Sequence, residues 1–289
     1  MRNHLIAIQG SVASFHDLAA KKYFGQDISL YECGSFKEVC DKIANNKADY
    51  GIIAIENKVA GSILLNYQLI EKYDLRVIGE IYLPIELQLL GRPSTKLSDI
   101  KEVISHPMAL GQSQTFLSEN EALLVTEYKD TATCAKMVEK DDTGRMAVIG
   151  GSSLVKYYNL VVLVDNVCDV KENFTRFYIL SKGDDYVSDP NKASVTLQVM
   201  NEPGKLSSVL EIIKKHNLNL SKIQSLPIPT ASNAYPFHLD LEFDNKLVFD
   251  KCISELKKEC VYLKVLGMYK SEVNKPKSNI EISNHKNLN

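Results

Sequence analysis

The sequence predicts an α/β fold followed by a second, smaller unit of mixed helices and strands. Apolar runs of strand length alternate with helical patterns through about the first 180 residues, which is typical of α/β proteins. A polar break with few apolar residues follows at 184–192, where we expect a domain boundary. Beyond the break, strands and helices follow a different order, which indicates an independent unit.

Ten apolar runs in the first part have the length and flanking residues of strands. We expect these strands at 5–8, 28–31, 50–55, 75–81, 85–90, 102–104, 123–128, 146–149, 161–164 and 174–180. Apolar residues spaced three and four apart, as at 36–43 and 63–70, predict helices between them. Small hydroxyl residues precede many of these helices, with Ser11 and Ser14 before the first. These hydroxyl residues predict helix N-caps. If several of the helix N-termini meet at one edge of the sheet, they also predict a binding site for an anion.

The second part reads as strand, helix, strand, strand, helix, strand. The strands are expected at 193–200, 218–223, 237–243 and 262–268, and the helices at 206–215 and 247–258. This order predicts a ferredoxin-like unit. The tail at 271–289 is rich in Lys, Asn, Ser and Glu without apolar periodicity, so we expect it to be disordered.

Composition and motifs narrow the classes of function. The chain has 289 residues, a net charge of −2, 45% hydrophobic and 24% charged residues, which argues against a nucleic-acid surface. No apolar run approaches the roughly 20 residues that cross a bilayer, and the six cysteines are scattered without metal or redox spacing. These features predict a cytoplasmic protein with reduced thiols. No nucleotide, metal or serine-nucleophile motif is present, so we expect no cofactor and no metal.

Polar residues at strand ends predict a hydrogen-bonding site. Asn173, Thr175 and Phe177 share one face of their strand, because side chains alternate with period two. Glu56-Asn57 ends another strand, and Ser105-His106-Pro107 ends a third, shortly before Gln112. Each cluster alone is also explained by capping or by a loop. Together they supply a carboxylate, amides and hydroxyls, which suit a cleft that binds its ligand by hydrogen bonds.

These segments, in their order and spacing, resemble prephenate dehydratase with a C-terminal ACT regulatory domain. The matching segments are Ile8-Gln9-Gly10 with Ser14-Phe15, Ile53 to Asn57 with Gly61-Ser62, Ser105-His106-Pro107 with Ala109-Leu110 and Gln112, Asp130-Thr131-Ala132, Asn173 to Phe177, Gly204-Lys205-Leu206, and Asn219 to Pro227. The resemblance runs from the first strand to about Tyr269. It departs from the family pattern in the opening segment and at Lys58, Met108, Gln224 and Leu226.

The resemblance implies a catalytic domain at 1–183 and an ACT domain at 193–270. The catalytic domain is expected to be periplasmic-binding-protein-like, with one lobe of about 1–76 plus 160–183 and the other of 77–159. The implied reaction converts prephenate to phenylpyruvate in L-phenylalanine biosynthesis by loss of carbon dioxide and water. Positioning and general-acid catalysis suffice for this reaction. An arogenate dehydratase and a non-catalytic amino-acid or keto-acid binding module are the alternatives. A bifunctional enzyme is disfavoured, because no mutase-like segment precedes Leu5.

The resemblance also assigns roles to individual residues. The catalytic residues it implies are Thr175, Asn57 and Gln112, and the substrate-binding residues are Glu56, Ser105, Ser14, Arg176 and Phe177. Strand alternation puts Arg176 opposite Thr175, so an ion pair that braces the site is its alternative role. L-Phenylalanine is the implied effector, bound in a homodimer or homotetramer by Gly204, Lys205, Leu206, Asn219, Leu220 and Ser225. The departures at Gln224 and Leu226 weaken the case for this feedback.

Overall fold

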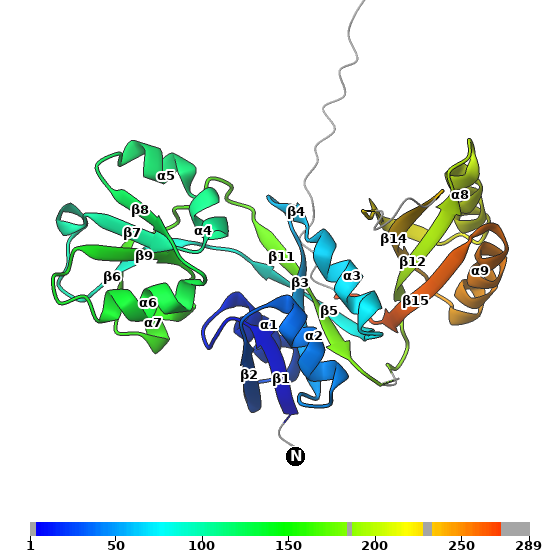
Figure 1. The fold of residues 1–289 in the computed structure, drawn as a ribbon, viewed down its shortest axis with the longest axis horizontal. Coiled ribbons are helices and arrows are strands. Elements are labelled where there is room, and N and C mark those ends of the chain that lie inside the picture. Colours follow the sequence, from blue (N-terminus) through cyan, green and yellow to red (C-terminus); the bar gives the residue numbers. More distant parts are fainter. Residues whose placement is uncertain (1–3, 184–186, 228–232, 273–289) are drawn as a thin grey trace, which may run out of the picture.

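The computed structural model describes residues 4–183, 187–227 and 233–272 of the chain. Its strands form three sheets that follow one another along the molecule (Figure 1). Part of the expected polar break and the expected tail from 273 onward lie outside the described residues. Within the described ranges, none of the helices combines the length and the apolar character that crossing a bilayer requires.

The first sheet has the strand order β2-β1-β3-β11-β5, and β4 pairs with β3. Its strands are β1 (His4–Gln9), β2 (Ile28–Cys33), β3 (Tyr50–Asn57), β4 (Gly61–Ser62), β5 (Arg76–Pro84) and β11 (Phe174–Ser181). The helices α1 (Phe15–Phe24), α2 (Phe36–Ala44) and α3 (Leu64–Lys72) connect them. β1 is parallel to both of its neighbours, whereas β11 enters antiparallel to β3 and β5. β11 therefore returns from the second sheet and inserts between β3 and β5.

The second sheet has the order β10-β6-β9-β7-β8. Its strands are β6 (Gln88–Gly91), β7 (Glu102–Ser105), β8 (Leu124–Glu127), β9 (Met146–Gly150) and β10 (Val161–Val164). Between them lie the 3-10 helix η1 (Leu97–Asp99), α4 (Pro107–Gly111), α5 (Gln114–Glu119), α6 (Thr131–Glu139) and α7 (Ser153–Tyr157). The chain crosses between the two sheets after β5 and again after β10, and the first crossing supplies Ile85 and Leu87 to the cavity described below.

The lobe limits expected from the sequence differ from those of the sheets. β5 was expected in the second lobe, but it pairs with β11 in the first sheet. β10 was expected in the first lobe, but it pairs with β6 in the second sheet. Both differences have the same origin. The chain crosses to the other lobe after β5 and after β10, whereas the expected limits placed the crossings before these two strands.

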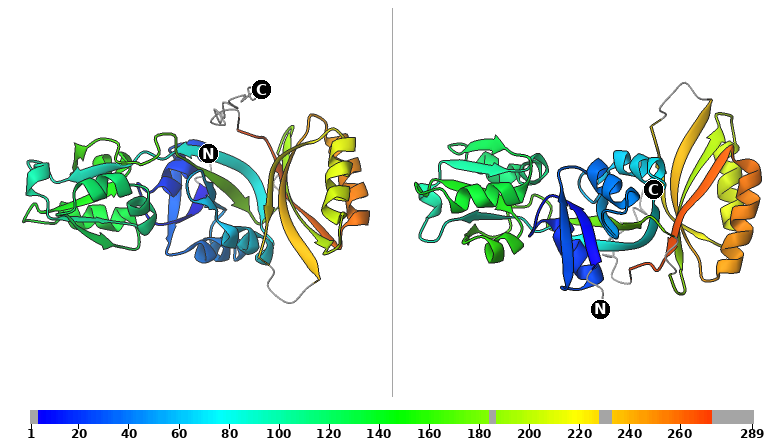
Figure 2. Two further views of the ribbon diagram at one scale, coloured as in Figure 1. Left: turned by 90° about the horizontal axis from the view of Figure 1, so that it is seen from above. Right: turned by 60° about the horizontal axis from the view of Figure 1, so that its bottom comes forward.

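The third sheet has the order β13-β14-β12-β15, and each of its neighbouring pairs is antiparallel. Its strands β12 (Lys192–Met200), β13 (Asn219–Ser225), β14 (Ala234–Glu242) and β15 (Tyr262–Tyr269) alternate with α8 (Lys205–Lys215) and α9 (Lys246–Glu259). This is the ferredoxin-like order predicted from the sequence. Both helices cover the face that points away from the first sheet (Figure 2).

The other face of the third sheet packs against the first sheet. One apolar cluster contains Val77 and Tyr178 of the first sheet together with Leu266 and Tyr269 of the third and Leu226, which directly follows β13. A separate cluster lies between the third sheet and its own helices. β12 is buried along nearly its whole length. Its apolar residues pack against the helices, whereas the alternate residues are polar, and Lys192 and Ser194 among them bond to Glu80 and Tyr178 of the first sheet.

Candidate active site

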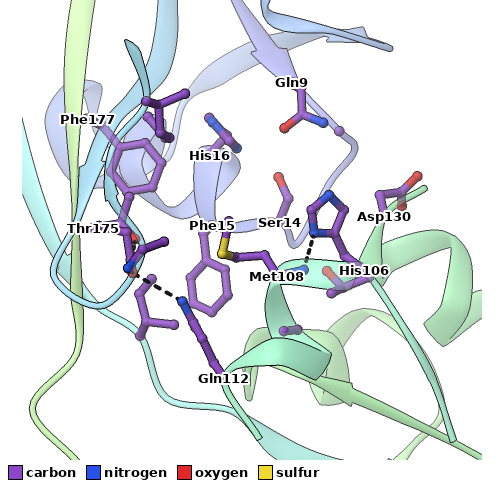
Figure 3. Close-up of a pocket in the computed structure, with 18 of the residues that line it drawn as sticks. Gln9, Ser14, Phe15, His16, His106, Met108, Gln112, Asp130, Thr175 and Phe177 are labelled. Carbon is purple, nitrogen blue, oxygen red and sulfur yellow. Dashed lines mark hydrogen bonds between the residues drawn. The ribbon is translucent and has the colours of Figure 1, made fainter. Parts of the chain in front are cut away.

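A cavity of about 320 Å³ lies between the first and second sheets (Figure 3). Residues of the first sheet and its helices line one side, and residues around α4 and the start of α6 line the other. Its polar lining residues are Gln9, Ser14, His16, Asn57, His106, Gln112, Asp130, Thr131 and Thr175. The remaining lining is largely apolar, which strengthens hydrogen bonds along the cavity walls.

The side chain of Asn57, at the end of β3, is held in a single orientation. Its Oδ1 accepts hydrogen bonds from the backbone N–H groups of Val59 at 3.0 Å and Ala60 at 2.9 Å. Because a backbone N–H can only donate, the amide oxygen must face this turn. The Nδ2 group therefore faces the cavity, where it donates to Thr175 Oγ1 at 3.0 Å and to Asn173 Oδ1 at 3.0 Å.

Gln112 joins this network from the second lobe. Its Nε2 donates to Asn57 Oδ1 at 3.1 Å, and its Oε1 accepts from Asn173 Nδ2 at 3.1 Å. Gln112 is the residue at the end of α4, whereas Asn57 and Asn173 lie beside β3 and β11. The network consequently connects the two lobes directly at the cavity.

The Thr175 hydroxyl is arranged to donate a proton into the cavity. Its oxygen accepts from Asn57, and no described residue accepts its own hydrogen. Thr175 is 8% exposed and lines the cavity together with Phe177, two residues further on the same strand face. The Asn57 N–H stabilises negative charge on the Thr175 oxygen, which makes the hydroxyl a better proton donor than a free alcohol.

Two histidines line the cavity as neutral rings. His106 Nδ1 accepts from the Met108 backbone N–H at 3.1 Å, which leaves the ring proton on Nε2 as a donor. Burial lowers the pKa of His106. Burial and the nearby His106 lower the pKa of His16 from 6.5 to about 3. Both rings therefore stay uncharged at neutral pH.

His16 is the less expected of the two. It lies in the first turn of α1, edge-on to Phe177 with 5.1 Å between ring centroids. Its ring is partly exposed to the cavity, but its Nε2 atom is buried without a hydrogen-bond partner among the described residues. Neither histidine has a role predicted from the sequence. The signal lay in their positions, directly after Ser14-Phe15 and inside the Ser105-His106-Pro107 segment.

Several of the expected site residues do line the cavity. Thr175, Asn57, Gln112, Ser14 and Phe177 are all among its lining residues. Ser14 also caps α1, because its Oγ accepts from the Asp17 backbone N–H at 3.3 Å. The expectation that hydroxyl residues cap the first helix is therefore correct at Ser14.

Ser105, Glu56 and Arg176 were expected to bind substrate, but the structure places all three outside the cavity lining. Ser105 is fully buried and donates to the Ile149 carbonyl at 2.6 Å. Glu56 and Arg176 each precede a cavity residue on a strand, so alternation turns them to the opposite face. There Arg176 forms ion pairs with Glu80 and Asp240, which agrees with its alternative bracing role.

The expected effector residues lie in the third sheet at two separate places. Gly204, Lys205 and Leu206 begin α8, shortly after β12 ends at Met200. Asn219, Leu220 and Ser225 belong to β13. Asn219 donates to Glu242 Oε2 at 2.7 Å, and Glu242 also pairs with Lys192 at the start of β12. Asn219 and Gly204 are therefore at opposite ends of the sheet within one chain.

The fold and the cavity define a two-lobed α/β protein with a ligand site between its lobes. The chain belongs to the prephenate dehydratase family, because the family model described as prephenate dehydratase matches residues 6–185. It is therefore an enzyme of that family. Within the described residues, no cluster of three or more His, Cys, Asp or Glu side chains is arranged to bind a metal ion.

Similar proteins extend over nearly the whole chain. The prephenate dehydratase of Methanocaldococcus jannaschii is 30% identical over 89% of this chain and 94% of its own. The structure of prephenate dehydratase in complex with L-phenylalanine from Arthrobacter aurescens has a TM-score of 0.81, 24% identity, and coverage of 92% and 90%. A structure described as GqqA, a novel type of quorum quenching acylase, has a TM-score of 0.83, 25% identity, and coverage of 93% and 98%.

Proposed function

We propose that this enzyme converts prephenate to phenylpyruvate, carbon dioxide and water, as its family membership indicates. The observation that carries the proposed mechanism is the Thr175 hydroxyl, which accepts a hydrogen bond from Asn57 and has its own proton free inside the cavity. The reaction makes the ring aromatic, so the enzyme needs to position the substrate and assist the leaving hydroxyl. Neither task requires a cofactor.

The chemical step uses the arrangement around Thr175 directly. The bond between the ring and its carboxylate breaks, carbon dioxide leaves, and the electron pair moves into the ring as the ring hydroxyl departs. Thr175 donates its proton to that hydroxyl, which leaves as water, and the Thr175 oxygen takes a proton back from solvent afterwards. Asn57 Nδ2 stabilises the charge that develops on the Thr175 oxygen, and Gln112 holds Asn57 in place.

Substrate binding must accommodate two carboxylates without a nearby cation, because no Lys or Arg is among the described cavity residues. The available donors are neutral and include the Gln9 amide, the His106 Nε2–H and the hydroxyls of Ser14 and Thr131. The Asp130 carboxylate lies on the same side and accepts from the N–H and the hydroxyl of Thr133. Neutral donors on apolar walls bind carboxylates through directed hydrogen bonds. We assign the substrate carboxylates to this side of the cavity, opposite Thr175 (Figure 3).

Two other activities are weaker candidates. Arogenate differs from prephenate by an amine in place of a carbonyl, and direct comparison of both substrates distinguishes them. Acyl transfer, as in the name of one structural neighbour, generally needs a hydroxyl or thiol activated by a base. In the described part of the cavity, no hydroxyl is hydrogen-bonded to a histidine: Thr175 binds Asn57, and Ser14 binds the Asp17 N–H.

The ferredoxin-like unit is proposed to be an ACT regulatory domain that binds L-phenylalanine. A phenylalanine complex of a structural neighbour supports this effector. Strand register places Asn219 and the start of α8 at opposite ends of the third sheet. Seven or more strand residues at about 3.3 Å each separate them, which exceeds the reach of one amino acid. An effector that contacts both segments must therefore bind between two copies, in a homodimer or homotetramer.

The direct test is phenylpyruvate formation by the purified protein, without added metal or cofactor, with prephenate and arogenate as separate substrates and with or without L-phenylalanine. Faster turnover of prephenate that falls as phenylalanine is added supports both the dehydratase and the regulatory proposals. Faster turnover of arogenate would identify arogenate as the substrate. Turnover that does not change with millimolar phenylalanine would contradict the proposal that phenylalanine is the effector. The absence of turnover on both substrates would leave the non-catalytic binding module.

A further inference from the structure

The two strands that carry Asn57 and Thr175 also face the third sheet. Glu56 precedes Asn57 on β3, and Arg176 precedes Phe177 and follows Thr175 on β11. Glu56 and Arg176 are register partners and point away from the cavity. Each of the two makes an ion pair with a residue of the third sheet. The residues of β3 and β11 that contact the third sheet are therefore direct sequence neighbours of Asn57 and Thr175, which face the cavity.

Lys222 of β13 makes the contact behind Asn57. Its Nζ lies 2.7 Å from Glu56 Oε1 and donates to Ser62 Oγ at 3.0 Å. Glu56 and Ser62 are the paired residues of β3 and β4. Lys222 thus bridges both ends of the turn that connects these strands.

The bridged turn contains the groups that orient Asn57. Val59 and Ala60 lie within it, and their N–H groups hold the Asn57 oxygen at 3.0 and 2.9 Å. If the turn opened, these two amides would move and the Asn57 side chain would lose the contacts that fix its orientation. The hydrogen bond from Asn57 to Thr175 depends on that orientation.

We propose that Lys222, together with Glu56, is a positioning residue for the dehydratase reaction: it closes the turn at 57–61 and thereby aims the Asn57 amide at Thr175. This inference rests on the proposed function for its kinetic consequence. It also gives the third sheet a route to the cavity, because Lys222 lies on the strand that carries Asn219, Leu220 and Ser225.

The Lys222 contact is better suited to adjustment than the Arg176 contact. Arg176, Glu80 and Asp240 are all at most 3% exposed, so separating them would leave unpaired charges in the interior. The side chains of Lys222 and Glu56 are 11% and 33% exposed, so water can replace part of their contact. A small shift of β13 can therefore release the turn while the buried ion pairs remain closed.

The test compares Lys222→Met with Lys222→Arg and with a matched control, Lys264→Met. Lys264 forms an ion pair with Asp74, which also connects the third sheet to the first part of the chain but lies away from β3 and β4. We expect Lys222→Met to lower kcat about 3- to 30-fold, with KM changed by less than about twofold. Lys222→Arg should recover most of the activity, and Lys264→Met should match the wild type.

A second measurement is independent of activity. Amide hydrogen exchange in the segment 57–62, which includes the Val59 and Ala60 donors, should be faster in Lys222→Met and unchanged in Lys264→Met. Wild-type exchange together with wild-type kcat in Lys222→Met would overturn the inference. Faster exchange in a protein that does not turn over prephenate would support the inference about the turn and reject the proposed function instead.

Discussion

Thr175 shows how one hydroxyl acquires a chemical role from its surroundings. As a strand residue it needs no functional explanation, because threonine is common in strands. In the structure its oxygen accepts from Asn57 while its proton faces the cavity. Thr175→Ala should therefore lower kcat about 10²- to 10⁴-fold, with an unchanged unfolding midpoint, and Thr175→Ser should retain part of the activity. Full activity of the alanine variant in the phenylpyruvate assay contradicts the assigned role.

Asn57 offers a more selective test of the same hydrogen bond. Asn57→Asp keeps the size of the side chain and the acceptor for Val59 and Ala60, but it replaces the N–H donor with a second acceptor. The Thr175 hydroxyl would then donate to the carboxylate instead of to the substrate. We expect kcat to fall about 10²-fold or more while circular dichroism stays unchanged. Near-normal kcat would mean that Asn57 acts through its oxygen alone.

His16 should leave a signature in the pH dependence of stability. Its pKa falls from 6.5 to about 3 on folding, first because of burial and second because of His106. Between these pH values the unfolded chain binds a proton that the folded chain rejects, so the free energy of unfolding falls as the pH is lowered. His16→Asn should flatten this decline by at most about 1.4 kcal/mol per pH unit. Urea unfolding from pH 7 to pH 4 measures it, and parallel curves for both proteins argue against a buried neutral His16.

At the scale of elements, β11 determines most of the site. Its period-two pattern correctly predicted that Thr175 and Phe177 share a face and that Arg176 lies opposite. Asn173 precedes the strand and joins the site by its hydrogen bonds with Asn57 and Gln112. The same reasoning failed for Ser105-His106, because the sequence does not show which of two neighbours faces a cavity. The structure turns Ser105 to the Ile149 carbonyl and leaves His106 in the cavity lining.

The contact between β15 and β5 depends on a glycine. A Cβ atom at Gly267 would lie 1.8 Å from the Val77 carbonyl oxygen, and that obstacle is backbone rather than a movable side chain. Gly267→Ala should reduce the free energy of unfolding by about 1–3 kcal/mol or more. Gly111→Ala, where nothing lies within 4 Å, is the matched control and should change little or stabilise slightly. Equal urea midpoints for the two variants contradict close packing at Gly267.

At the scale of the whole molecule, buried charges join the third sheet to the first. Asp240 of β14 pairs with Arg176 of β11 and accepts hydrogen bonds from Ser194 at 2.7 Å and Tyr178 at 3.1 Å. Glu80 pairs with both Arg176 and Lys192. The charges balance within this buried group, so each one has an opposite partner across the contact between the two sheets. Removing one partner would leave an uncompensated buried charge, which is strongly destabilising.

Asp240→Asn tests this docking. Burial alone would raise the pKa of Asp240, but Arg176 and His238 hold it well below its ordinary value of 3.8. The stabilisation is therefore complete above about pH 4 and is lost as the pH falls through the lower folded pKa. We expect a loss of about 3 kcal/mol at pH 7, shrinking as the pH drops below 4. A difference that stays constant down to pH 2, measured by urea unfolding, argues against an ionised Asp240.

The sequence by itself determined the order of strands and helices, the ferredoxin-like unit, the family and the placing of Thr175 and Asn57 in one site. These follow from local periodicity and from motifs, which are properties of neighbouring residues. Only the tertiary structure decided that Glu56 and Arg176 serve the contact with the third sheet, that His16 enters the cavity, and that β5 and β10 exchange lobes relative to the expectation. Such decisions depend on which distant segment covers each face, because a strand exposes two equivalent faces and its own sequence does not specify their partners.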